Sequence, residues 1–79
     1  MGFYIRIKKT SESATSAEYS FSPDEAQFGH LRIDKSTGEV SLVRSLVGDE
    51  RGEFFSRAAA RLRKEYKSGR LPDLTEWAS

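Results

Sequence analysis

Residues 52–68 read GEFFSRAAARLRKEYKS, and they repeat apolar side chains at the spacing of an amphipathic α-helix. Drawn on a helical wheel, the apolar arc covers about 140°. Its members are Phe54, Phe55, Ala58, Ala59, Leu62 and Tyr66. We therefore expect a helix with one side packed on a core. Asp49 or Glu50 is expected to stabilise the start of this helix, because a carboxylate there meets unpaired backbone N–H groups. Gly69 and then Pro72 provide a stop.

The opposite side of this predicted helix is basic and is a candidate partner-binding surface. Its members are Arg57, Arg61, Arg63, Lys64 and Lys67. A row of cations over several helical turns can track phosphate groups, so nucleic-acid binding through this side is one hypothesis. A solvated or protein-facing helix is the alternative, because the helix dipole favours cations in the last turns and Glu53 and Glu65 can pair with arginines. The whole chain carries a net charge of only +1.

Upstream of the helix, alternating apolar and polar residues predict four strands. The side chains expected to point inward are Phe3, Ile5, Ile7, Ala17, Tyr19, Phe21, Leu31, Ile33, Val40 and Leu42. Residues 34–39 predict the hairpin between the last two strands, because Asp34 can accept a backbone N–H and Gly38 can take a left-handed conformation. Pairing Ile33 with Val40 keeps the apolar residues of both strands on one face.

The face of the sheet away from the helix is a second candidate surface. The residues expected there are Tyr4, Arg6, Lys8, His30 and Arg32, with Val43 as a further member. We single out Tyr4, Arg6 and Arg32 as candidate partner-binding residues, because Tyr and Arg are enriched in protein interfaces and can also stack on bases. A mixed polar surface with no partner is the alternative.

Three other stretches lie outside these predicted elements. Residues 9–16 are polar and rich in hydroxyl groups, and they are expected to form a mobile loop. Residues 26–29 have room for one helical turn. The tail is expected to dock on the sheet or the helix through Leu71, Leu74 and Trp77, with an exposed peptide for a partner as the alternative.

Residues for catalysis or metal binding are few. The chain has no cysteine and one histidine, His30, which is expected on the wet face of a strand. Asp34, in the same strand, would lie about 13 Å away, too far to orient the imidazole. Zinc and calcium motifs and phosphate-binding glycine loops are absent from the sequence. We therefore expect a protein that is not an enzyme and that has no metal, cofactor or small-molecule substrate. Catalysis through His30 is the third hypothesis, after protein binding and nucleic-acid binding.

Together these observations predict one α+β domain over residues 1–79. We expect a four-stranded antiparallel meander with the C-terminal helix packed on one face, or a three-stranded sheet as the fallback. The lack of cysteine and of long apolar segments predicts a cytoplasmic, bacterial protein with no membrane span. The expected function is non-enzymatic binding of an unidentified protein partner, with a homodimer as one form and nucleic acid as the alternative ligand.

Overall fold

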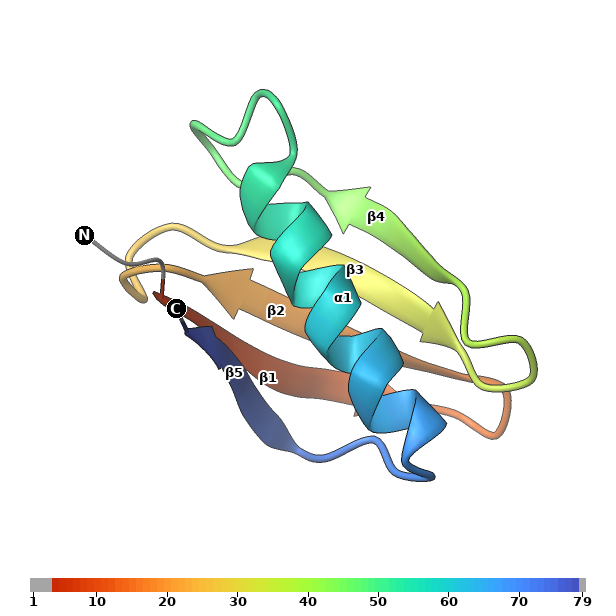
Figure 1. The fold of residues 1–79 in the computed structure, drawn as a ribbon. Helices are drawn as coiled ribbons and strands as arrows, with labels where there is room; N and C mark the ends of the chain where they lie inside the picture. The colour runs from red at the N-terminus through yellow and green to blue at the C-terminus, as the bar shows by residue number, and fades with distance from the viewer. Residues whose placement is uncertain (1–3, 79) are drawn as a thin grey trace.

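The computed structural model describes residues 4–78 as a five-stranded antiparallel sheet with one helix across one face (Figure 1). The strands are β1 (Tyr4–Glu12), β2 (Ser16–Ser22), β3 (Gly29–Asp34), β4 (Val40–Arg44) and β5 (Leu74–Ala78), and the helix is α1 (Glu53–Lys67). Their order in the sheet is β4-β3-β2-β1-β5. The α+β arrangement is confirmed. The predicted four-stranded meander is present but incomplete, because the chain returns after α1 to add β5 beside β1.

β5 is formed by the tail that was expected only to dock. It runs antiparallel to β1, with Trp77 opposite Ile5 and Thr75 opposite Ile7. Trp77 is half-buried against the core, as is Leu71 before the strand. Leu74 is 54% exposed, so the expectation that it docks is wrong. Register places Leu74 opposite Lys8, on the face that the helix does not cover.

The hydrophobic core lies between α1 and the sheet. Seven strand residues are completely or almost completely buried: Ile5, Ile7, Ala17, Tyr19, Phe21, Leu31 and Ile33. From the helix, Ala58 and Leu62 are fully buried, while Phe54, Phe55 and Tyr66 pack around them half-buried. Leu42, expected inside, is 43% exposed because α1 runs over the middle strands and leaves β4 at its side (Figure 1). Phe3 lies outside the described residues.

The β3–β4 hairpin has the predicted turn chemistry. Asp34 Oδ1 accepts hydrogen bonds from the backbone N–H groups of Ser36 and Thr37, at 2.8 and 3.2 Å. Gly38 has a φ of 78°, in the left-handed region. The predicted pairs Ile33–Val40 and Leu31–Leu42 are both present. Beyond them the register shifts, so that Arg44 lies opposite His30 and Val43 is the extra residue of a bulge.

Both ends of α1 follow the predicted pattern. Asp49 accepts the backbone N–H groups of Phe54 and Phe55 on its two carboxylate oxygens, at 3.1 and 3.0 Å. These groups have no partner within the helix, so Asp49 stabilises its first turn. At the other end Gly69 has a φ of 92° and donates to the carbonyl of Tyr66 at 3.0 Å, which ends the helix.

Residues 9–16 are mostly strand, so the predicted mobile loop is wrong. β1 continues to Glu12 and β2 begins at Ser16, which leaves only residues 13–15 as the turn. The hydroxyl of Ser13 accepts the backbone N–H groups of Thr15 and Ser16 at 3.2 and 3.1 Å. The hydroxyl-rich composition thus serves a tight turn. Residues 26–29 are not helical either, since a bend leads directly into β3.

Glu12 holds two lysines at the end of the β1–β2 hairpin. Its carboxylate oxygens pair with Lys35 and with Lys9, the latter at 2.8 Å. The hydrogen bonds from these two lysines, that of Lys35 first, lower the pKa of Glu12 from 4.5 to about 2. Because the folded-state pKa is depressed, these interactions stabilise the fold above the unfolded-state pKa and lose their effect as the pH falls through the folded-state value.

We therefore expect Glu12→Gln to flatten the fall in stability between about pH 5 and about pH 2. The free energy of unfolding, measured with urea at several pH values, checks this. Glu50→Gln is the control, because Glu50 is exposed and makes no ion pair with residues 4–78. An acid dependence identical in Glu12→Gln and in the native protein would contradict the expectation.

Candidate functional site

The predicted basic face of α1 is divided by contacts within the chain. The guanidinium of Arg57 lies 5.4 Å from the centre of the Trp77 ring and 3.9 Å from the carboxylate of Glu53. Arg61 donates a hydrogen bond to the hydroxyl of Thr75 at 3.2 Å. Both arginines therefore stabilise the packing of α1 against β5, and contacts within the chain partly balance their positive charge.

Glu65 is buried at the same junction and was not predicted there. Its carboxylate accepts the hydroxyl of Thr75 at 3.1 Å and pairs with Arg61 at 3.0 Å. Arg70, just after the helix, lies 3.6 Å from its second oxygen. The carboxylate is thus fully used in joining the helix to β5, which explains how a charged residue is accommodated beside the core.

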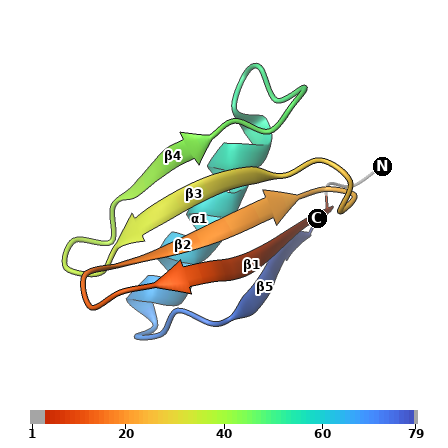
Figure 2. The same cartoon turned by 180° about the vertical axis from the view of Figure 1, so that it is seen from behind.

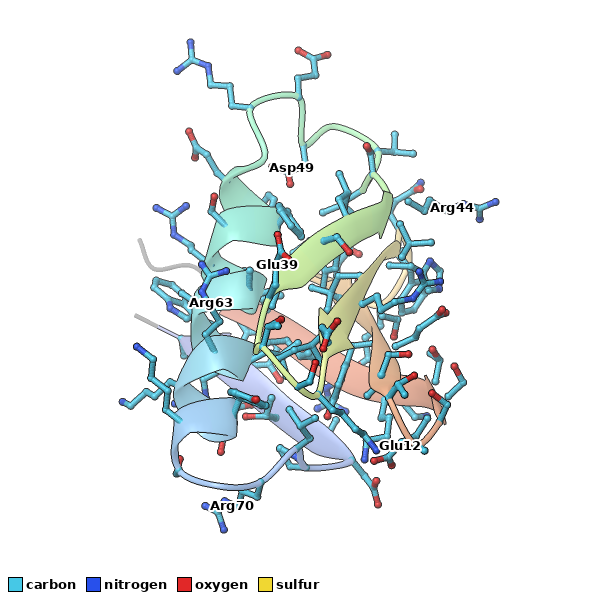
Figure 3. All side chains as sticks on the ribbon, turned by 90° about the vertical axis from the view of Figure 1, so that its right-hand side faces the viewer. Glu12, Glu39, Arg44, Asp49, Arg63 and Arg70 are labelled. Carbon is cyan, nitrogen blue, oxygen red and sulfur yellow. The ribbon has the colours of Figure 1, made fainter. Side chains whose placement is uncertain are left out.

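Arg63, Lys64 and Lys67 are the remaining three residues of the predicted face. All three are exposed, and none of them makes an ion pair with any residue from 4 to 78. In Figure 3, Arg63 lies on α1 and Arg44 lies on the other side of the sheet. An open cationic surface on α1 therefore comprises three residues instead of five.

Figure 2 shows the face of the sheet away from α1. The predicted residues Tyr4, Arg6 and Arg32, which alternate with the buried core residues of their strands, are exposed. Arg6 pairs with Glu25 at 3.0 Å and donates a longer bond of 3.4 Å to the Tyr4 hydroxyl. Arg32 binds one oxygen of Glu18 through two nitrogens, at 2.7 and 3.1 Å. The predicted placement is correct, but carboxylates of this chain already partner both guanidinium groups.

A neighbouring row of residues on this face has no such carboxylates. Register pairs Lys8 with Ser20, Ser20 with His30 and His30 with Arg44, so the four side chains cross β1, β2, β3 and β4 in one line. We call these residues the Lys8–Arg44 row. Lys8 and Arg44 are exposed and make no ion pair within residues 4–78.

The Lys8–Arg44 row lines an open hollow on the sheet surface, with a volume of about 830 Å³. The other lining residues are Lys9, Thr10, Gln27, Phe28, Ser45 and Val47. No carboxylate is among them. Strand alternation placed Lys8 and His30 on this face, but the bulge at Val43, which brings Arg44 opposite His30, leaves no clear mark in the sequence.

Edge strand β4 is a further exposed feature. It is hydrogen-bonded to β3 on one side and lies at the end of the sheet. Leu42 is 43% exposed, Val43 is 49% exposed, and Val47 just after the strand is 74% exposed. An edge strand offers unpaired backbone N–H and C=O groups, and here it also presents apolar side chains.

His30, the candidate catalytic residue of the sequence, lies between two strand neighbours that are not carboxylates. The cross-strand neighbours of His30 are Ser20 and Arg44, so register supplies the imidazole with no orienting carboxylate. Among residues 4–78, no three His, Cys, Asp or Glu side chains are placed to hold a metal ion. No helix in that range has the length and apolar character needed to cross a membrane. No protein-family model matches the chain, and comparisons with curated proteins and with solved structures find no match.

Proposed function

We propose that this chain is a protein-interaction domain that associates through edge strand β4, and that its partner is a second copy of the chain. The observation that carries the proposal is the exposure of Leu42, Val43 and Val47 along one unpaired edge. Apolar side chains beside free backbone groups favour the addition of a strand from another molecule. On the opposite edge strand, β5 (residues 74–78), Leu74 is the one exposed large apolar side chain, and Trp77 is half-buried under Arg57.

A twofold axis at Leu42 gives a self-complementary arrangement. Two β4 strands would run antiparallel, with Leu42 opposite its counterpart and Ser41 opposite Val43 of the second copy. The bulge at Val43 ends regular pairing beyond this point, so side-chain burial carries much of the interaction. The net charge of +1 adds little repulsion between copies. A chain of 79 residues buries a small core and gains from the additional burial.

Leu42→Glu is expected to abolish this association, because it places two carboxylates against each other at the twofold axis. Sedimentation velocity from about 1 to about 500 μM should show the native protein passing from monomer to dimer. The variant should stay monomeric over this range. Its dimer dissociation constant should be at least about tenfold higher, which corresponds to a loss of about 1.4 kcal/mol in the free energy of association.

Leu74→Glu is the matched control, since Leu74 is also an exposed leucine, at 54% against 43% for Leu42, and lies on the opposite edge strand. It is expected to dimerise like the native protein. A native protein that remains monomeric over the whole range, or two variants that weaken association equally, would reject the role of β4.

Nucleic-acid binding through the outer face of α1 is the second candidate function. The observation that favours it is the group of Arg63, Lys64 and Lys67, which are exposed and lack ion-pair partners within residues 4–78. Three phosphate contacts on a duplex would give a slope near −3 for the logarithm of affinity against the logarithm of salt concentration. Duplex DNA binding that survives Arg63→Glu together with Lys64→Glu would exclude this candidate.

A further inference from the structure

We propose that the concave face of the sheet binds single-stranded nucleic acid, with phosphates on Lys8 and Arg44 and a base stacked on Phe28. This site lies on the open face of the sheet, away from the outer face of α1, and it shares Val47 with the proposed dimer surface at the β4 edge. Pairing at the edge of β4 would extend the sheet sideways and leave this face open. The proposal therefore does not depend on the dimer.

The dimensions of the Lys8–Arg44 row suit a ligand larger than one ion. Neighbouring strands lie about 4.8 Å apart, so the backbone positions of Lys8 and Arg44 are separated by about 14 Å. Between them lie a small hydroxyl side chain, Ser20, and an imidazole, His30. Ser20 is 9% exposed and donates to the carbonyl of Lys8 at 3.4 Å, so it forms the floor of the hollow. Cations therefore stand at both ends of a polar floor.

Phe28 supplies an aromatic surface at the rim. Its side chain is 43% exposed although it is large and apolar. The next residue, Gly29, packs so closely that an added Cβ would lie 2.4 Å from the buried ring of Phe21. This contact anchors the backbone directly after Phe28 and fixes where the ring emerges. An exposed aromatic beside cations is the combination by which sheet surfaces bind single strands, whereas an acidic peptide needs the cations alone.

The charge of the rest of this face restricts the ligand to one end of the sheet. Toward the β3–β4 hairpin, a second hollow is lined by Glu18, Asp34 and Glu39, with Arg32 as its one cation. Phosphates are repelled there and attracted at the Lys8–Arg44 row. With two phosphate contacts, the slope of log affinity against log salt for a single strand is about −1.4.

Fluorescence anisotropy with a labelled oligothymidylate of about 12 nucleotides tests the site. Lys8→Gln and Arg44→Gln should each weaken binding and bring the salt slope closer to zero by about 0.7. Phe28→Ala should weaken binding about 5-fold to 100-fold and leave the salt slope unchanged, because stacking releases no counterions. These three side chains are exposed, so circular dichroism and thermal unfolding should match those of the native protein.

Arg51→Gln is the matched control for Arg44→Gln, since Arg51 is an exposed arginine that makes no ion pair within residues 4–78 and does not line the hollow. It is expected to bind the oligonucleotide like the native protein. Absence of binding at low salt, or an equal loss of binding in Arg51→Gln, would overturn the proposal. Polyglutamate binding that is at least as tight and depends equally on Lys8 and Arg44 would assign the site to acidic peptides and overturn it as well.

Discussion

Leu62→Ala is expected to lower the free energy of unfolding by about 3 to 5 kcal/mol. Leu62 is fully buried on the inner side of α1 and belongs to the core cluster with the strand residues. Its removal leaves a cavity between a helix and a hydrogen-bonded sheet, two elements that cannot easily close over it. A chain of 79 residues has a total stability of roughly 4 to 12 kcal/mol, so this one change removes much of it.

Urea unfolding followed by circular dichroism measures this loss. Leu74→Ala is the control, because the same side chain is shortened on the open face of the sheet, where Leu74 is 54% exposed. Its expected cost is below about 1 kcal/mol. If the two variants lost similar amounts of stability, α1 would not pack on the sheet through Leu62.

The helix and the β3–β4 hairpin could be predicted because their signals are local. The apolar spacing of residues 52–68 placed Ala58 and Leu62 inside, and both are buried. In the turn, the side chain of Asp34 accepts a backbone N–H group and the backbone of Gly38 takes the left-handed conformation. Such signals need no information about residues that are distant in sequence.

β5 could not be predicted in the same way, because a distant partner determines it. Of the two residues that β5 directs toward the helix side, Trp77 is apolar and Thr75 is not, so alternation is weak. The strand forms because β1 provides its hydrogen bonds and α1 covers its inner side. Glu65 is a related case, since its burial depends on Thr75 and Arg70 returning to the end of the helix.

The sequence predicted where the candidate residues lie, but it did not predict which of the cations lack an acidic partner. Alternation correctly placed Tyr4, Arg6 and Arg32 on the open face. Which cations keep an unbalanced charge depends on partners that sequence spacing does not reveal. Glu18 on the neighbouring strand and Glu25 in a loop pair with the predicted arginines. The same is true of α1, where contacts with β5 occupy Arg57 and Arg61 and leave the other three cations open.

Gly38→Ala is expected to lower the free energy of unfolding by about 2 to 4 kcal/mol, from two separate causes. The φ of 78° is unfavourable for any residue with a Cβ, at about 1 to 2 kcal/mol. The new Cβ would also lie 2.6 Å from the ring of Tyr66. That ring cannot simply move away, because the Tyr66 hydroxyl donates to the carbonyl of Lys35 at 2.7 Å and joins the helix to the hairpin.

Gly48→Ala separates the two causes. Gly48 has a φ of 89°, but an added Cβ would meet no atom of residues 4–78 within 4 Å. It should therefore lose only the conformational part, about 1 to 2 kcal/mol. In a Tyr66→Ala background the cost of Gly38→Ala should fall to the same value, and this double-mutant cycle isolates the contact. Equal losses in the free energy of unfolding for Gly38→Ala and Gly48→Ala in the native background would mean that the β3–β4 hairpin does not pack against Tyr66 of α1.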